Sequence, residues 1–230
     1  MYYIIHIYIY IYESPRYLEV SGEFVAVLGP DDSHKYLGRK MSGDMRGRGK
    51  VELAHRVQIA WMRFHKHRDI LLDRNLNIRS RLRFFQSVIS TTVLYGLSAC
   101  ALTGKQMESL DVVQRKMFRR MAGWSRVHGE EWSDTMRRMG VKVGNALRLH
   151  PVEDWSRQLL RRQFRMVCRL QQRSHEWAMR LSHWKPELTS AAAHRTQGRP
   201  PTRWDDRLNA FEVEYGKLAG SVCESISPTL

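Results

Sequence analysis

The hydrophobic positions after Lys50 repeat with the period of an α-helix. Apolar residues recur at spacings of three and four in two successive segments, as one face of an amphipathic helix requires. The apolar positions are Ala54, Val57, Trp61, Phe64 and Leu71 in the first segment and Ile78, Leu82, Phe85, Ile89 and Val93 in the second. Because the turn-prone stretch 73–75 separates them, the pattern predicts two consecutive helices.

A third helix is predicted from the signals at its two ends. Thr103 and Gln106 have the spacing of a capping box, in which each side chain satisfies a backbone N–H group of the first turn. Gly123 would end the helix. The inward-facing positions would be Leu110, Val113, Met117 and Met121. We therefore expect a bundle of helices over residues 51–124.

The segment before this bundle has a residue pattern typical of β-strands. Short runs of β-branched and aromatic residues on either side of Ser21-Gly22 predict a β-hairpin over residues 16–28. The Gly- and Arg-rich residues 41–50 predict a loop, because glycine disfavours helix. Residues 16–50 would thus hold one hairpin and a loop.

The C-terminal third predicts further helices. Pro151 would open a long helix, and a last helix would follow a linker at 183–202, so that 151–220 form a second, smaller helical unit before a tail at 221–230. Four tryptophans of this region are expected in the core, with base-stacking platforms as the alternative: Trp155, Trp177, Trp184 and Trp204.

Residues 125–150 are expected to link the two helical regions, with one weakly helical stretch at 132–139. The predicted fold class is mainly α: a short β-hairpin, a helical bundle and a second, smaller helical unit.

The first fifteen residues have a different character. This run of Tyr and Ile ends at Glu13 and Pro15, which is too short for a membrane-spanning helix, and it lacks the charged start and cleavage site of a signal peptide. As a peptide it would be an aggregation-prone strand. Because alternating Tyr and Ile is also what a TATATA repeat encodes, we expect residues 1–15 to be translated repeat DNA outside the fold.

The net charge and the cysteine content indicate which classes of partner and which compartment to expect. A formal net charge of +15 points to an anionic partner, most often nucleic acid, although a merely soluble basic protein is the alternative. Cys100, Cys168 and Cys223 stand far apart without ligand spacing, so we expect no metal site and no disulfide-linked partner. They indicate an intracellular, reducing compartment, and a nucleic-acid partner would be compatible with the nucleus.

The basic residues gather on predicted helix faces. At 100° per residue, the basic side chains of the third helix lie opposite its apolar stripe. The candidate phosphate-binding residues are Arg79, Arg81 and Arg83 on the second helix and Arg115, Lys116, Arg119 and Arg120 on the third. A further row recurs at every fourth position of the long helix: Arg157, Arg161, Arg165 and Arg169. A face of one sign suits a nucleic-acid backbone, although any solvated helix face carries charge.

The order of four motifs resembles the segment after the catalytic palm in reverse transcriptases of non-LTR (LINE-type) retrotransposons. The motifs are KYLG, AHRVQIAWMRF, RLRFFQSVISTTVLYG and LDVVQRKMFRRMAGW. The resemblance covers residues 17–124 and, more loosely, 152–211, which include GRPPTRWDDRL. It implies that residues 16–28 are the last hairpin of the palm. It also implies that 51–123 are the thumb, which clamps a template–primer duplex through its backbone.

The catalytic part of such an enzyme is absent from this sequence. The family holds its metal ions, normally Mg²⁺, on carboxylates that include an aromatic-x-Asp-Asp hairpin. The Asp-Asp pairs here, at 31–32 and 205–206, lack that pattern. Nucleophile-elbow, zinc-protease and phosphate-loop motifs are also absent. We therefore expect no catalytic residue, no cofactor and no activity of the chain on its own.

Two interpretations from different classes remain. The first is a truncated remnant of a mobile-element reverse transcriptase, whose thumb binds RNA or DNA duplex weakly and without sequence preference. The second is a basic helical interaction module for an acidic protein, with Trp-rich helices as its docking surface. An active RNA-directed DNA polymerase would require that an upstream segment supply the palm.

Overall fold

The computed structural model describes residues 17–27, 29, 32–42 and 47–171. The chain divides into two compact units, residues 1–52 and 53–230. The predictions for the opening run, for the linker at 183–202, for the last helix and for Trp177, Trp184, Trp204 and Cys223 lie outside the described residues.

The first unit contains two antiparallel hairpins. Strands β1 (Tyr17–Val20) and β2 (Glu23–Ala26) form the predicted hairpin, with Tyr17 opposite Ala26. Strands β3 (Ser33–Tyr36) and β4 (Arg39–Ser42) form a second hairpin, which the sequence analysis did not predict. Its turn residues Leu37 and Gly38 both have positive φ, 47° and 76°. A two-residue hairpin turn requires this conformation, but leucine rarely adopts it, so the sequence carried a weak turn signal.

The second hairpin is fastened to the start of helix α2 (Arg48–Lys66). Glu52 is buried, and its carboxylate accepts a hydrogen bond of 2.5 Å from the Lys40 backbone N–H and lies 3.8 Å from Arg39 Nε. Arg48 Nε donates to the carbonyl of Ser42 at 3.2 Å. These contacts join the end of β4 to the first turns of the helix.

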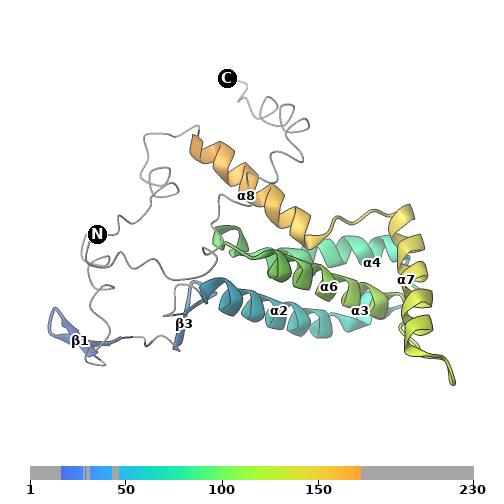
Figure 1. The fold of residues 1–230 in the computed structure, drawn as a ribbon, viewed down its shortest axis with the longest axis horizontal. Coiled ribbons are helices and arrows are strands. Elements are labelled where there is room, and N and C mark those ends of the chain that lie inside the picture. The colour runs from blue at the N-terminus through green and yellow to red at the C-terminus, as the bar shows by residue number, and fades with distance from the viewer. Residues whose placement is uncertain (1–16, 28, 30–31, 43–46, 172–230) are drawn as a thin grey trace, which may run out of the picture. The chain divides into compact units, whose positions relative to one another are not determined.

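The second unit is helical, which confirms the mainly α fold class (Figure 1). The remainder of α2 is followed by α3 (Arg68–Leu72), α4 (Ile78–Phe84), the π-helical turn η1 (Phe85–Ser90), α5 (Thr91–Leu94) and the short 3-10 turn η2 (Leu97–Ala99). Helices α6 (Gly104–Met121), α7 (Trp132–Leu149) and α8 (Trp155–Gln171) complete the described part. The first predicted helix is thus divided at His67, and the second continues through η1.

Helix α6 begins as predicted. Thr103 Oγ1 accepts a hydrogen bond from the Gln106 N–H at 3.3 Å, and Gln106 Oε1 accepts one from the Thr103 N–H at 2.7 Å, so the capping box is complete. After the last turn, Gly123 has a φ of 79°, a conformation that glycine adopts without strain.

Helix α7 occupies a stretch that the sequence analysis assigned mostly to a linker. Its buried residues Thr135, Met139 and Val143 recur at every fourth position. This stripe is narrow and includes a polar residue, and Gly140 and Gly144 lower the helix propensity. Both properties weakened the periodic signal that reveals the other helices.

Helix α8 shares the core of the bundle rather than starting a separate unit. The indole of Trp155 is fully buried and stacks on Phe85, with ring centroids 5.7 Å apart, while its Nε1 donates to Ser90 Oγ at 2.8 Å. The Trp155 N–H also donates to Gln114 Oε1 of α6. Pro151 interrupts the helical path between α7 and α8, and this local break resembles a boundary between units in the sequence.

Candidate nucleic-acid interface

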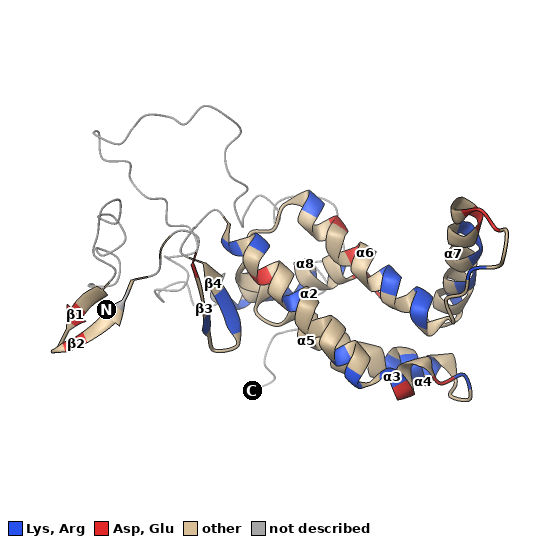
Figure 2. Cartoon of the chain, turned by 90° about the horizontal axis from the view of Figure 1, so that it is seen from below, with Lys and Arg blue, Asp and Glu red and all other residues tan. Residues whose placement is uncertain are grey.

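The exposed basic face of α6 is the centre of the candidate interface (Figure 2). Its apolar stripe, which includes Leu110 and Met117, is buried in the bundle. Arg115 and Lys116 are exposed, as the helical wheel predicted, whereas Arg119 is half-buried. Within the described residues, none of these three cations forms an ion pair with a carboxylate. The face therefore presents positive charge without internal neutralisation.

The α6 cations also lie close enough to influence one another. Arg115 Nε donates to the Asp111 carbonyl one turn earlier at 3.2 Å, which fixes part of its guanidinium. Partial burial lowers the pKa of Arg119, and the neighbouring charge of Arg115 lowers it further. An arginine nevertheless stays protonated in a protein. An anion bound between these side chains would relieve their repulsion.

Arg120 differs from the other basic residues of α6. Its guanidinium lies over the ring of Trp61 in α2, 4.9 Å from the ring centroid. A cation held over an indole is attracted by the ring's negative face. Arg120 therefore helps to hold α6 against α2, although its side chain remains exposed.

The three candidate arginines of α4 fall on two sides of the helix. Arg79 and Arg83 are exposed and one turn apart, as expected. Arg81 is only 8% exposed, and its Nη1 donates to the carbonyls of Leu71 at 3.3 Å and Met121 at 2.8 Å. Burial lowers its pKa, and the nearby Asp73 opposes this effect. The expectation that Arg81 belongs to the basic surface is corrected, because residues two apart on a helix point about 200° apart.

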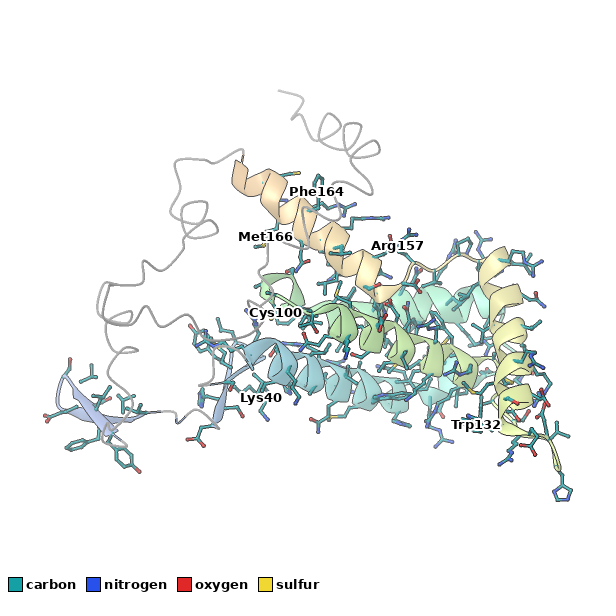
Figure 3. All side chains as sticks on the ribbon, in the orientation of Figure 1. Lys40, Cys100, Trp132, Arg157, Phe164 and Met166 are labelled. Carbon is teal, nitrogen blue, oxygen red and sulfur yellow. The ribbon has the colours of Figure 1, made fainter. Side chains whose placement is uncertain are left out.

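Helix α8 carries the second basic row. Its exposed positions are Arg157, Arg161, Arg165 and Arg169 (Figure 3 labels Arg157). Arg161 Nη2 is paired with Glu153 at 2.6 Å. Arg162, between Arg161 and Arg165 in the sequence, is half-buried. Burial lowers its pKa, and the charge of Arg165 lowers it further. This row adds charge to the same unit of the protein.

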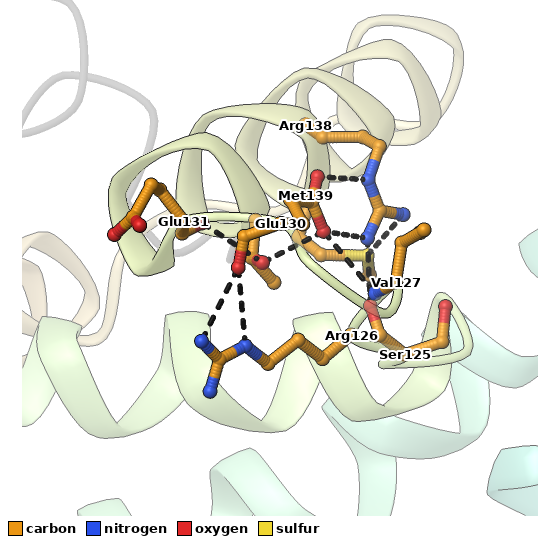
Figure 4. Close-up of polar contacts among 8 residues, drawn as sticks. Ser125, Arg126, Val127, Glu130, Glu131, Arg138 and Met139 are labelled. Atoms are coloured by element: carbon orange, nitrogen blue, oxygen red, sulfur yellow. Dashed lines mark hydrogen bonds and ion pairs between the residues drawn. The ribbon is translucent and has the colours of Figure 1, made fainter.

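The loop between α6 and α7, which the sequence did not reveal, is held in place by a network of polar contacts (Figure 4). The Glu130 carboxylate accepts hydrogen bonds from Arg138 Nε and Nη2 at 2.9 and 2.8 Å, from Thr135 Oγ1 at 2.7 Å and from the Val127 N–H at 3.3 Å. These bonds, led by those from Arg138, lower the pKa of Glu130 to about 2. Glu130 precedes α7, and side chains in contact within a helix are three or four residues apart, so periodicity could not reveal this pair.

The remaining features of the described residues limit the chemistry. No group of three or more His, Cys, Asp or Glu side chains in this part of the chain could hold a metal ion. Cys100 and Cys168 are buried, and neither forms a disulfide within the described residues. No helix in the described ranges is long and apolar enough to cross a bilayer. The guanidinium and ammonium groups of α6 and α8 are of the type that binds anionic oxygens.

Comparisons with protein-family models, with curated proteins and with solved structures find no match to this chain.

Proposed function

We propose that the helical unit binds the sugar–phosphate backbone of an RNA or DNA duplex without reading its sequence. The observation that carries the proposal is the row of Arg115, Lys116 and Arg119, which lies on one face of α6 without a carboxylate partner in the described residues. Neutralisation of phosphates by such cations releases counterions and gives affinity that is independent of sequence.

The proposal extends to the origin of the chain. The resemblance to the thumb and C-terminal region of non-LTR reverse transcriptases gives the basic face a role, which is to grip a duplex during synthesis. In an intact enzyme of this family the catalytic carboxylates belong to the palm, and the aromatic-x-Asp-Asp pattern is absent from the present sequence. We therefore propose a catalytically incomplete remnant that retains binding.

A charge-neutralised variant tests the binding proposal. The variant combines Arg115→Gln, Lys116→Gln and Arg119→Gln. Its matched control combines Arg63→Gln of α2 with Lys142→Gln and Arg148→Gln of α7, three exposed residues that, like the α6 cations, form no ion pair within the described residues. Binding of the full chain to two RNA–DNA hybrids of unrelated sequence would be measured by fluorescence anisotropy over a range of salt concentrations.

The α6 variant should bind both hybrids more weakly and to the same extent. The slope of log Kobs against log salt concentration should fall by up to about 0.9 per lost contact, or about 2.7 for all three. The control should keep most of the affinity and slope. An equal loss of affinity in the control, or a loss of affinity for only one hybrid, would contradict binding of the phosphate backbone by α6.

A further inference from the structure

Two tryptophans, one on each side of the loop between α6 and α7, are placed differently from the others in the described bundle. Trp132 is 58% exposed and Trp124 is 37% exposed, and their rings meet edge to face with centroids 5.7 Å apart. Trp155, by contrast, is buried in the core, and Trp61 lies under Arg120. Two exposed aromatic rings in contact form a contiguous apolar surface, and such surfaces mark interaction sites on proteins.

The loop that carries the pair is held in one conformation. Gly123 turns the chain from α6 toward Trp124, and Trp132 is the first residue of α7. Between them, Arg138 Nη2 donates to the Ser125 carbonyl at 2.7 Å and binds the Glu130 carboxylate, while Arg126 donates to the Glu130 carbonyl at 3.2 Å. Because these bonds order the loop before any ligand arrives, binding costs less conformational entropy.

The pair also lies beside the proposed phosphate-binding face. Trp124 follows the last residue of α6, Met121, by three positions, and Arg119 occupies the last turn of that helix. Helix α7 packs against α6, and Figure 3 labels Trp132 at the N-terminal end of α7. A strand held by its phosphates along α6 would therefore have its next bases near the two indoles.

We propose that Trp124 and Trp132 form a stacking platform for an unpaired nucleobase, such as the first base beyond the end of a duplex. Aromatic side chains stack on any base, which agrees with binding that ignores sequence. The acids close to the platform are mostly neutralised, since Glu130 is paired with Arg138 at 2.8 Å and Asp134 with Arg137 at 2.9 Å. Glu131 forms no ion pair within the described residues. This inference rests on the proposed backbone binding and adds the class of ligand.

Three ligands distinguish the contribution of base stacking to affinity from the contribution of phosphate charge. They are a blunt RNA–DNA hybrid, the same hybrid with a short single-stranded overhang, and that hybrid with abasic sugars in the overhang. The last two carry equal numbers of phosphates, so their affinities differ only through the bases. The full chain should bind the base-bearing overhang about 5- to 150-fold more tightly than the abasic one, the range expected for one stacked base.

Variants of Trp132 locate the effect. Trp132→Ala should remove most of the preference for the base-bearing overhang, and Trp132→Phe should retain much of it, while both bind the blunt hybrid like the wild type. Since Trp132 is exposed, its replacement should leave the unfolding midpoint nearly unchanged. Trp124→Ala provides a second, independent variant with the same expected direction.

Several results would overturn the platform. Equal binding of the base-bearing and abasic overhangs by the wild type would do so, while salt-dependent binding of the blunt hybrid would leave the proposed function standing. If Trp132→Ala lowers the affinity for all three ligands equally, the tryptophan pair serves the fold. If it changes only the self-association measured by sedimentation, the pair forms an interface between copies of the chain. Failure to bind any of the three ligands would overturn both proposals.

Discussion

At the residue scale, Arg81 shows how a charged side chain stabilises this bundle from within. Its guanidinium closes the C-terminal ends of two helices by donating to the carbonyls of Leu71 in α3 and Met121 in α6. The last carbonyls of a helix have no partner within it, and they carry the negative end of the helix dipole. A buried cation at this point satisfies both requirements.

Replacement of Arg81 should therefore lower the free energy of unfolding. Arg81→Gln is too short to reach both carbonyls, and the loss of charge-assisted hydrogen bonds should lower the free energy of unfolding by about 1.5–3 kcal/mol. Arg83→Gln, on the exposed side of α4, should change it by less than about 0.5 kcal/mol. Urea unfolding followed by circular dichroism measures both, and equal effects would contradict the structural role of Arg81.

Glu130 should make stability depend on pH in the acid range. Its pKa is lowered from 4.5 in the unfolded chain to about 2 in the fold. The carboxylate therefore contributes stability fully above about pH 4.5, and this contribution is lost as the pH falls toward 2. The thermal midpoint of the wild type should fall more steeply across this window than that of Glu130→Gln. Glu131→Gln, at the exposed neighbouring position, should behave like the wild type.

At the element scale, the helices with strong local signals could be predicted, and those that depend on distant contacts could not. The capping box at Thr103 and the apolar stripe of α6 appear as expected, because both are encoded within a few residues. The β3–β4 hairpin depends on a strained Leu37, and α7 on a narrow buried stripe that includes Thr135. Neither follows a standard turn or a clear apolar period.

The contact of α8 with the bundle gives a test at this scale. Ser90→Ala removes the acceptor of the buried Trp155 indole N–H and leaves it unpaired. This should lower the free energy of unfolding by about 1–3 kcal/mol. The double variant with Trp155→Phe, which has no N–H to satisfy, should show less than the sum of the two single losses. Strict additivity in denaturant unfolding would argue against this link between η1 and α8.

In the candidate site, too, the positions encoded within one helix were predictable and those that depend on contacts between elements were not. Arg115, Lys116 and Arg119 were predictable because one helical wheel determines their face. The burial of Arg81 depends on the ends of α3 and α6, and the pairing of Trp124 with Trp132 depends on a loop ordered by Glu130. Sequence periodicity carries no signal for such contacts between elements.

At the scale of the whole molecule, exposed apolar residues on the first hairpin predict self-association. Phe24 is 75% exposed in a two-stranded sheet, and a hairpin of this size is marginally stable alone. Sedimentation velocity should show oligomers that grow with concentration, and Phe24→Ser should reduce them. Met62→Ser, at an α2 position that is 63% exposed, is the control and should have little effect. A chain that stays monomeric at all concentrations would contradict this expectation.

A competition experiment distinguishes the proposed binding of nucleic acid by the basic unit from binding of any polyanion. A labelled RNA–DNA hybrid bound to the full chain would be displaced by unlabelled hybrid or by polyglutamate of equal total charge at one salt concentration. Backbone binding predicts that the hybrid competes at a clearly lower concentration. Equal displacement by polyglutamate would contradict this proposal and favour a module for acidic proteins.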